Sequence, residues 1–202
     1  MPNFDEKLKN TPDLSGTLRW PNVPACYGWL SLDRRGQWRM QGEPVTHSGL
    51  ASFLNRQYGH DESGNFFVQN GPQRVFVELD YTPWVMRLTS ESALQTHTGM
   101  PVTRIFAAAF DEEGNLLLEF TEGIALLCDR DLPALLSCLR QPDGQTAEDG
   151  AVLDLLALPH GALSTLTLRW HGEDIPVQML HRSTIASRYG FVAAPSAPMT
   201  ES

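Results

Sequence analysis

The stretch that decides the fold covers residues 27–88 and opens with YGWLSLDRRGQWRMQG, residues 27–42. Side chains of residues 27–32 alternate between two faces, which predicts a strand. Asp33 fits the first position of a type I turn, and a second strand is expected over residues 37–41. Asp33 stands where a catalytic acid could lie, but its role in the turn explains it, so we interpret it as structural.

The remainder of this stretch predicts a helix, a hairpin and a corner. Leu50, Phe53 and Leu54 recur at helical spacing, so we expect an amphipathic helix over residues 47–58 with Thr46 as its N-cap. The elements expected after it are a hairpin of residues 65–69 and 74–79, a corner over residues 80–83 and a strand over residues 84–88.

The second half of the chain predicts another sheet. Residues 102–110 are apolar on both faces, which is typical of a central strand. Residues 163–170 alternate most regularly, with Leu166, Leu168 and Trp170 facing inward. Three carboxylates at residues 111–113 form a hairpin tip that we interpret as solvated charge. The other expected elements are strands over residues 116–120, 124–127 and 175–180 and helices over residues 129–140 and 181–189. Residues 151–158 fit either a helix or a strand, and their leucine-rich composition favours the helix.

These patterns predict an α+β protein with two small β-rich, roll-like lobes, each an antiparallel sheet with a packed helix. The polar, unpatterned residues 90–99 mark the boundary between the lobes. The expected divisions are a flexible arm (1–19), an N-terminal lobe (20–95), a C-terminal lobe (96–194) and a flexible tail (195–202).

Composition narrows the classes of function. The 202 residues are 42% hydrophobic and 19% charged, which is a globular balance, and the net charge of −9 opposes binding to nucleic acid. No apolar run is long enough to span a membrane, and the N-terminus lacks the apolar core of a secretory signal. Cys26, Cys128 and Cys138 are widely spaced, as expected of reduced thiols in the cytoplasm.

Common catalytic and cofactor motifs are absent from the sequence. It contains no Gly-x-Ser-x-Gly elbow and no glycine-rich phosphate loop. The six histidines are scattered, mainly over loops and turns, and no two of them share a spacing typical of metal ligands. We therefore expect no cofactor and no metal.

Short motifs along most of residues 27–192 resemble the DUF1285 family of uncharacterised bacterial proteins, or a sister family of it. The resemblance implies two small α+β roll-like lobes and brings no catalytic residues with it. The motifs that carry it are Gly36-x-Trp38-x-x-x-Gly42-x-Pro44-Val45, the Leu50/Phe53/Leu54 helix, Gly64 to Val68, Val77-Glu78, Pro83-Trp84-Val85, Pro176-Val177 and Ile185 to Tyr189.

Five residues are candidates for a binding site. Tyr81 and Trp84 lie at the corner, where Pro83 fixes the backbone, and His181, Arg182 and Arg188 lie on the last helix. Aromatic and arginine side chains together are typical of binding surfaces. The alternative is that both aromatic residues belong to the core and Arg188 is a solvated flank.

Two functional hypotheses remain. The first is a non-enzymatic binding or interaction module for a protein partner or a small molecule, with a homodimer paired through a sheet edge as one form of it. The second is a small-molecule enzyme with its site at the seam between the lobes, where clefts tend to form.

Overall fold

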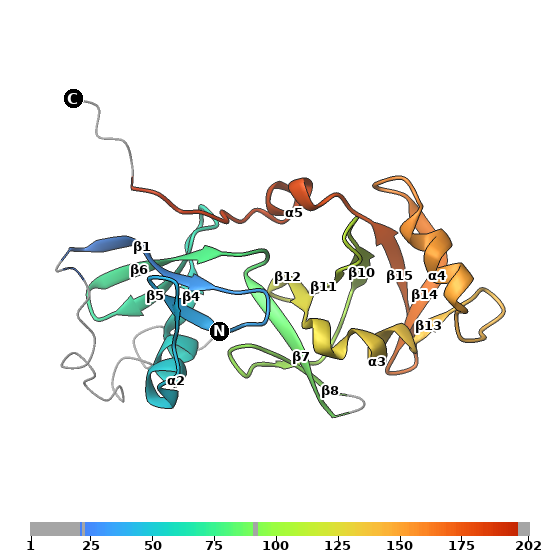
Figure 1. Cartoon of the computed structure of the whole chain (residues 1–202), viewed down its shortest axis with the longest axis horizontal. Helices are drawn as coiled ribbons and strands as arrows, with labels where there is room; N and C mark the ends of the chain where they lie inside the picture. The colour runs from blue at the N-terminus through green and yellow to red at the C-terminus, as the bar shows by residue number, and fades with distance from the viewer. Residues whose placement is uncertain (1–20, 22, 91–92, 198–202) are drawn as a thin grey trace.

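The computed structural model describes residues 21, 23–90 and 93–197. Its strands form two sheets, of six and nine strands, with short helices packed on them. The sheets make two lobes that lie side by side (Figure 1), which confirms the predicted α+β class with two β-rich lobes. The predicted arm over residues 1–19 lies outside the described residues, as do residues 198–202 of the predicted tail.

The first sheet has the strand order β3-β2-β1-β6-β5-β4. Its strands are β1 (Ala25–Leu32), β2 (Trp38–Met40), β3 (Glu43–Pro44), β4 (Tyr58–His60), β5 (Phe66–Asn70) and β6 (Gln73–Leu79). Helix α2 (Ser48–Gln57) buries Phe53 and Leu54. Its N-cap is His47 and not the predicted Thr46, because the Leu50 N–H donates to His47 Nδ1 (3.1 Å).

The second sheet has the strand order β13-β14-β15-β10-β11-β12-β7-β8-β9. In β14, Leu166, Leu168 and Trp170 are buried as their alternation predicts. The strands are β7 (Trp84–Ser90), β8 (Ala93–Thr96), β9 (Pro101–Val102), β10 (Ala107–Phe110), β11 (Leu116–Phe120), β12 (Gly123–Leu127), β13 (Leu139–Arg140), β14 (Leu163–Trp170) and β15 (Glu173–Met179). The helices that accompany it are the 3₁₀ turn η2 (Asp129–Asp131), α3 (Leu132–Leu136), α4 (Asp149–Leu156) and α5 (Arg182–Tyr189).

Both sheets are mixed rather than purely antiparallel as expected. β1 pairs in parallel with β6, β10 with β15, and β12 with β7. Each parallel pair joins strands that are distant in sequence, so hairpin patterns could not reveal it. Buried apolar side chains from both sheets belong to one hydrophobic cluster, which means that the lobes share a core.

Some elements differ from the sequence-based expectation. The helix expected over residues 129–140 ends at Leu136, because Leu139 pairs with Leu168 in the sheet. The strand expected over residues 102–110 is interrupted between β9 and β10. The sheets change at residues 80–83, earlier than the boundary that we placed at residues 95 and 96, since β7 and β8 already belong to the second sheet.

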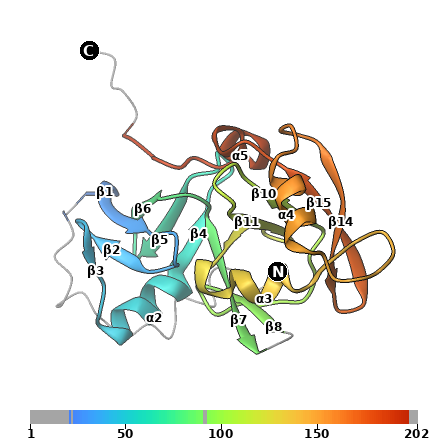
Figure 2. The ribbon, with the colours of Figure 1, turned by 45° about the vertical axis from the view of Figure 1, so that its right-hand side comes forward.

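The segment after α5 returns to the first lobe (Figures 1 and 2). The Val192 N–H donates to the Gly64 carbonyl (2.9 Å), and the Leu79 N–H donates to the Ala193 carbonyl (2.8 Å). Gly64 has φ +78°, and a Cβ there would lie 2.1 Å from the Gly190 carbonyl oxygen. The close approach of this C-terminal segment, residues 190–197, therefore requires glycine at residue 64.

None of the helices in the described residues is long and apolar enough to cross a membrane.

Candidate functional site

The corner between the two sheets is held by side-chain hydrogen bonds. Thr82 Oγ1 donates to the Trp84 carbonyl (2.7 Å) and accepts from the Leu126 N–H (3.0 Å). Tyr58 donates its hydroxyl to the Pro83 carbonyl (2.8 Å). These bonds tie the corner to both lobes, so the position of Tyr81 within it is fixed.

Tyr81 reaches from the corner to the hairpin between β10 and β11. Its hydroxyl donates to the carboxylate of Asp111, which is fully buried. Asp111 Oδ1 also accepts from the backbone N–H groups of Glu113 and Asn115, both at 2.9 Å. The prediction that this tip is solvated charge is therefore wrong for Asp111, because its carboxylate closes its own turn and pairs with a buried phenol. Burial and the Asp111 carboxylate raise the pKa of Tyr81, so the phenol stays protonated.

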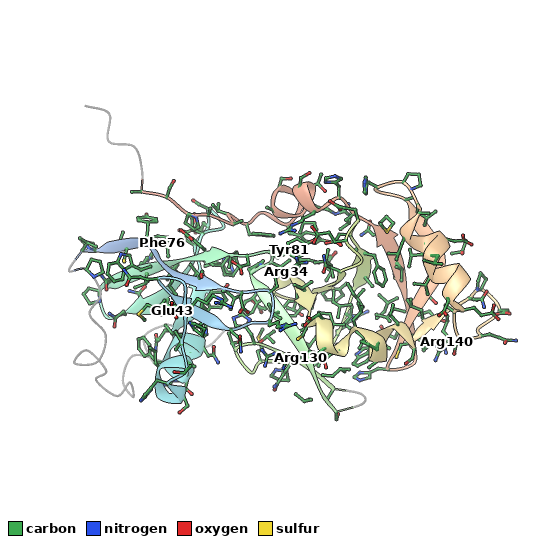
Figure 3. The ribbon with its side chains drawn as sticks, viewed as in Figure 1. Arg34, Glu43, Phe76, Tyr81, Arg130 and Arg140 are labelled. Atoms are coloured by element: carbon green, nitrogen blue, oxygen red, sulfur yellow. The ribbon has the colours of Figure 1, made fainter. Side chains whose placement is uncertain are left out.

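Two arginines from different lobes meet at Tyr81. The guanidinium carbons of Arg34 and Arg182 lie 5.2 Å and 4.8 Å from the ring centre, and Figure 3 shows Arg34 beside Tyr81 in the middle of the molecule. Arg34 also binds Glu113 Oε2 (3.2 Å), and Arg182 binds Glu113 Oε1 (2.7 Å). These donors, with Asn115, lower the pKa of Glu113. Arginines from both lobes therefore bind the same carboxylate, that of Glu113.

Polar side chains also surround the start of α5. His181 is the N-cap residue, and its Nδ1 accepts from the Ser183 N–H (3.2 Å) and from Ser183 Oγ (2.8 Å). Glu112 Oε2 accepts from the Arg182 N–H (2.9 Å), and Glu112 Oε1 lies 3.6 Å from His181 Nε2. The backbone hydrogen bond from Arg182 is the main cause that lowers the pKa of Glu112, so its carboxylate is ionised at neutral pH.

A hollow of about 430 Å³ opens at this place, between the corner, the hairpin tip, α5 and the C-terminal segment. Its polar residues come from the corner, the tip and the start of α5, and its apolar residues from β6, α5 and the C-terminal segment. The residues that line it are Leu79, Asp80, Tyr81, Glu112, His181, Arg182, Ser183, Ile185, Ala186, Phe191 and Ala193. We call it the seam hollow.

Three of the five candidate residues from the sequence meet in the seam hollow: Tyr81, His181 and Arg182. Trp84 does not line it. Its side chain is 7% exposed, and its indole N–H donates to the Glu122 carbonyl (3.1 Å), so Trp84 belongs to the core. Tyr81 is equally buried and belongs to the same hydrophobic cluster, as the alternative held for both aromatic residues. Arg188 is exposed on α5 and donates to Gln178 Oε1 (3.3 Å), outside the lining.

Sequence reasoning missed Glu112, Ser183 and Phe191 as lining residues. Glu112 looked like solvated charge at a hairpin tip, and its partner Arg182 is 70 residues away. The sequence around Phe191 gives no indication of a site, because Phe191 reaches the hollow only through the return of the chain to the first lobe. In the part of the chain that the structure describes, no group of three or more His, Cys, Asp or Glu side chains is placed to hold a metal ion.

The seam hollow is similar in size to small-molecule sites. Its volume lies within the range of about 300–1,000 Å³ that is usual for ligand pockets. Apolar side chains with a few polar groups at one end are typical of such pockets.

Comparisons with known proteins give a match to a family of unknown function and a likeness to two solved structures. A model of the family DUF2944, described as "Protein of unknown function (DUF2946)", matches residues 14–196. The chain is similar to the crystal structure of a DUF1285 family protein from Silicibacter pomeroyi DSS-3, with 14% identity, a TM-score of 0.51 and coverage of 84% of this chain and 88% of that chain. No curated protein matches the chain.

A DUF1285 family protein from Shewanella baltica OS155 also matches, with 12% identity, a TM-score of 0.40 and coverage of 52% of this chain and 87% of that chain. The likeness to the Silicibacter pomeroyi protein confirms the resemblance to DUF1285 at the level of the fold. At such identities, a structural likeness shows the fold and carries no ligand or activity to this chain.

Proposed function

Because this chain belongs to the DUF2944 family, whose description assigns no function, we propose a function from the geometry of the seam. We propose that the protein is a non-enzymatic binding module that takes a small molecule in the seam hollow. The observation that carries this proposal is that Tyr81, His181 and Arg182 meet there beside an apolar wall. The fixed corner and the shared carboxylate of Glu113 support it, since a preformed site loses little entropy on binding.

The sheet edges support a small molecule over a partner that pairs with a strand. Among the described strands, the edges of the two sheets are β3, β4, β9 and β13. Each of these has only two or three residues. Such short edge strands offer few hydrogen bonds to another chain and are a known protection against edge pairing. A homodimer paired through a sheet edge is therefore the weaker form of the binding hypothesis.

The experiment fills the hollow and looks for a bound molecule. Ala186 is half-buried and lines the hollow, so Ala186→Trp should occupy its space. Ala157 is exposed at the end of α4, and Ala157→Trp is the matched control. Native mass spectrometry of protein freshly purified from its host should show an added small-molecule mass on the wild type and on the control but not on Ala186→Trp. The same added mass on Ala186→Trp, or none on the wild type, contradicts the proposal.

One observation favours an enzyme as the second candidate. Ser183 Oγ, His181 and Glu112 have the order of a nucleophile, a base and an orienting carboxylate, with separations of 2.8 Å and 3.6 Å. The backbone N–H groups that could bind an oxyanion are already used, however. Those of residues 182, 183 and 184 donate to Glu112 Oε2, His181 Nδ1 and the His181 carbonyl.

A fluorophosphonate probe separates the two candidates, because it reacts with activated serines. We expect no covalent mass increase of the wild-type protein. An increase that disappears in Ser183→Ala would favour the enzyme and contradict the non-enzymatic proposal.

We place this function in the bacterial cytoplasm. Cys26, Cys128 and Cys138 are free thiols in the structure, as is usual in a reducing compartment. The acidic net charge of −9 supports a ligand other than nucleic acid.

A further inference from the structure

The charged groups that line the seam hollow are not balanced. Arg182 and Arg34 share the carboxylate of Glu113, and their second positive charge is matched by the buried carboxylate of Asp111 beside Tyr81. Neither of these two carboxylates lines the hollow. The other charged side chains of the lining are the carboxylates of Asp80 and Glu112, together with His181. The net charge of the lining side chains after these pairings is therefore negative.

Neither carboxylate is paired with a lysine or an arginine in the described residues. Asp80 is exposed, and its carboxylate oxygens have no hydrogen-bond or ion-pair partner there. Glu112 accepts one backbone N–H, and its Oε1 lies 3.6 Å from His181 Nε2, beyond normal hydrogen-bond distance. Both carboxylates can therefore accept a hydrogen bond from a bound molecule.

The start of α5 opposes this negative charge but does not cancel it. A helix N-terminus is equivalent to about half a positive charge, whereas Asp80 and Glu112 are two full negative charges. The net charge of the whole chain, −9, adds a field of the same sign. Cations are thus attracted to the hollow and anions are repelled from it.

The other side of the hollow requires an apolar body. Of the apolar residues that border it, Leu79, Ile185 and Phe191 are buried, whereas Ala186 and Ala193 are partly exposed. A hydrated inorganic cation has no apolar surface with which to cover this wall. A molecule that covers the wall removes apolar area from water, which is worth about 25 cal/mol per Å².

We propose that the seam hollow selects a small organic amine, with its ammonium group at the rim of Asp80 and Glu112 and its apolar body against the wall at Ala186 and Ala193. This inference rests on the proposed binding function and names the class of ligand. The ammonium donates hydrogen bonds to the two carboxylates, and Arg182 stays paired with Glu113.

Three probes with one carbon chain and different head groups test the class of ligand: hexylamine, 1-hexanol and hexanoate. Isothermal titration of the full chain at low salt should give the tightest binding for hexylamine and the weakest for hexanoate. Asp80→Asn and Glu112→Gln should each weaken hexylamine binding about two- to fivefold, as expected for exposed charge pairs. Neither change should weaken 1-hexanol binding by a similar factor. Glutamine can still accept the Arg182 N–H, so the start of α5 should keep this hydrogen bond.

Glu148→Gln is the control, because Glu148 is exposed before α4 and makes no side-chain cap hydrogen bond. It should bind hexylamine as the wild type does. Hexanoate binding that equals or exceeds hexylamine binding and is lost in Ala186→Trp would overturn the amine inference and leave the proposed function standing. No binding of any probe, or binding that Ala186→Trp leaves unchanged, would overturn both.

Discussion

His97 makes the stability of this protein depend on pH. Its ring centre lies 5.5 Å from that of Trp38, 5.3 Å from Tyr58 and 5.7 Å from Trp84. Its Nδ1 accepts weakly from the Val85 N–H (3.4 Å), while Nε2 has no hydrogen-bond partner in the described residues. Burial, with a smaller contribution from the positive charge of a nearby arginine, lowers the pKa of His97 from 6.5 to about 3.

The direction of the effect follows from the two pKa values. Between about pH 6.5 and pH 3 the unfolded chain binds a proton at His97 and the folded chain does not, so stability falls as the pH falls. At about pH 4.5, two pH units below the unfolded value, a fully buried ring would cost about 2.7 kcal/mol. Because His97 as a whole is partly exposed, we expect a loss of about 1–3 kcal/mol.

The assay is urea unfolding, followed by tryptophan fluorescence, at about pH 7.5 and about pH 4.5. His97→Asn keeps a polar atom near the position of Nδ1 and cannot titrate, so its loss of stability between the two pH values should be about 1–3 kcal/mol smaller than that of the wild type. His60 is exposed, and His60→Asn should lose as much as the wild type. If the wild type and His97→Asn lose equal stability, our reasoning about His97 is refuted.

Three substitutions test other parts of the fold. Leu168 is fully buried, and Thr167 lies on the opposite face of β14. In urea unfolding, Leu168→Asp should therefore cost more than about 4 kcal/mol and Thr167→Asp under about 1 kcal/mol. Similar losses would contradict the assignment of the two residues to opposite faces of the strand. Gly64→Ala should release the C-terminal segment, seen as faster hydrogen exchange of the Val192 amide, and unchanged exchange would show that the added Cβ is accommodated. Trp84→Ala should cost about 3–5 kcal/mol, as for a core tryptophan, and a loss under about 1 kcal/mol would place Trp84 outside the core.

Strands with one buried face could be predicted because burial imposes an alternating pattern on the sequence. β14 is the clearest example, with every second residue from Leu166 to Trp170 buried. β8 also alternates in burial, but one of its two buried residues, Thr96, is polar, so its sequence shows no apolar alternation. The leucines around α3 have helical spacing, yet Leu139 forms sheet pairs with β14. Pairing with a distant strand outweighed local periodicity there.

The candidate site could be predicted where the local backbone carries a signal. Pro83 marked the corner that holds Tyr81, and the cap and last helix marked His181 and Arg182. Glu112 completes the site through a contact with Arg182, far along the chain, and no local pattern reports such a contact. Trp84 has the same local setting and the same burial as Tyr81, and only the packing of the two lobes determines that Tyr81 borders the hollow and Trp84 does not.

The path of the C-terminal segment has a consequence for the order in which the protein is completed during synthesis. Hydrogen bonds at Gly64 and Leu79 of the first lobe have their partners at Val192 and Ala193. More than half of the chain is therefore made between Leu79 and its partner. Domains usually fold as units, N-terminal first, while the ribosome is still extending the chain. Here the lobe that is made first acquires these backbone contacts only after the second lobe has been made.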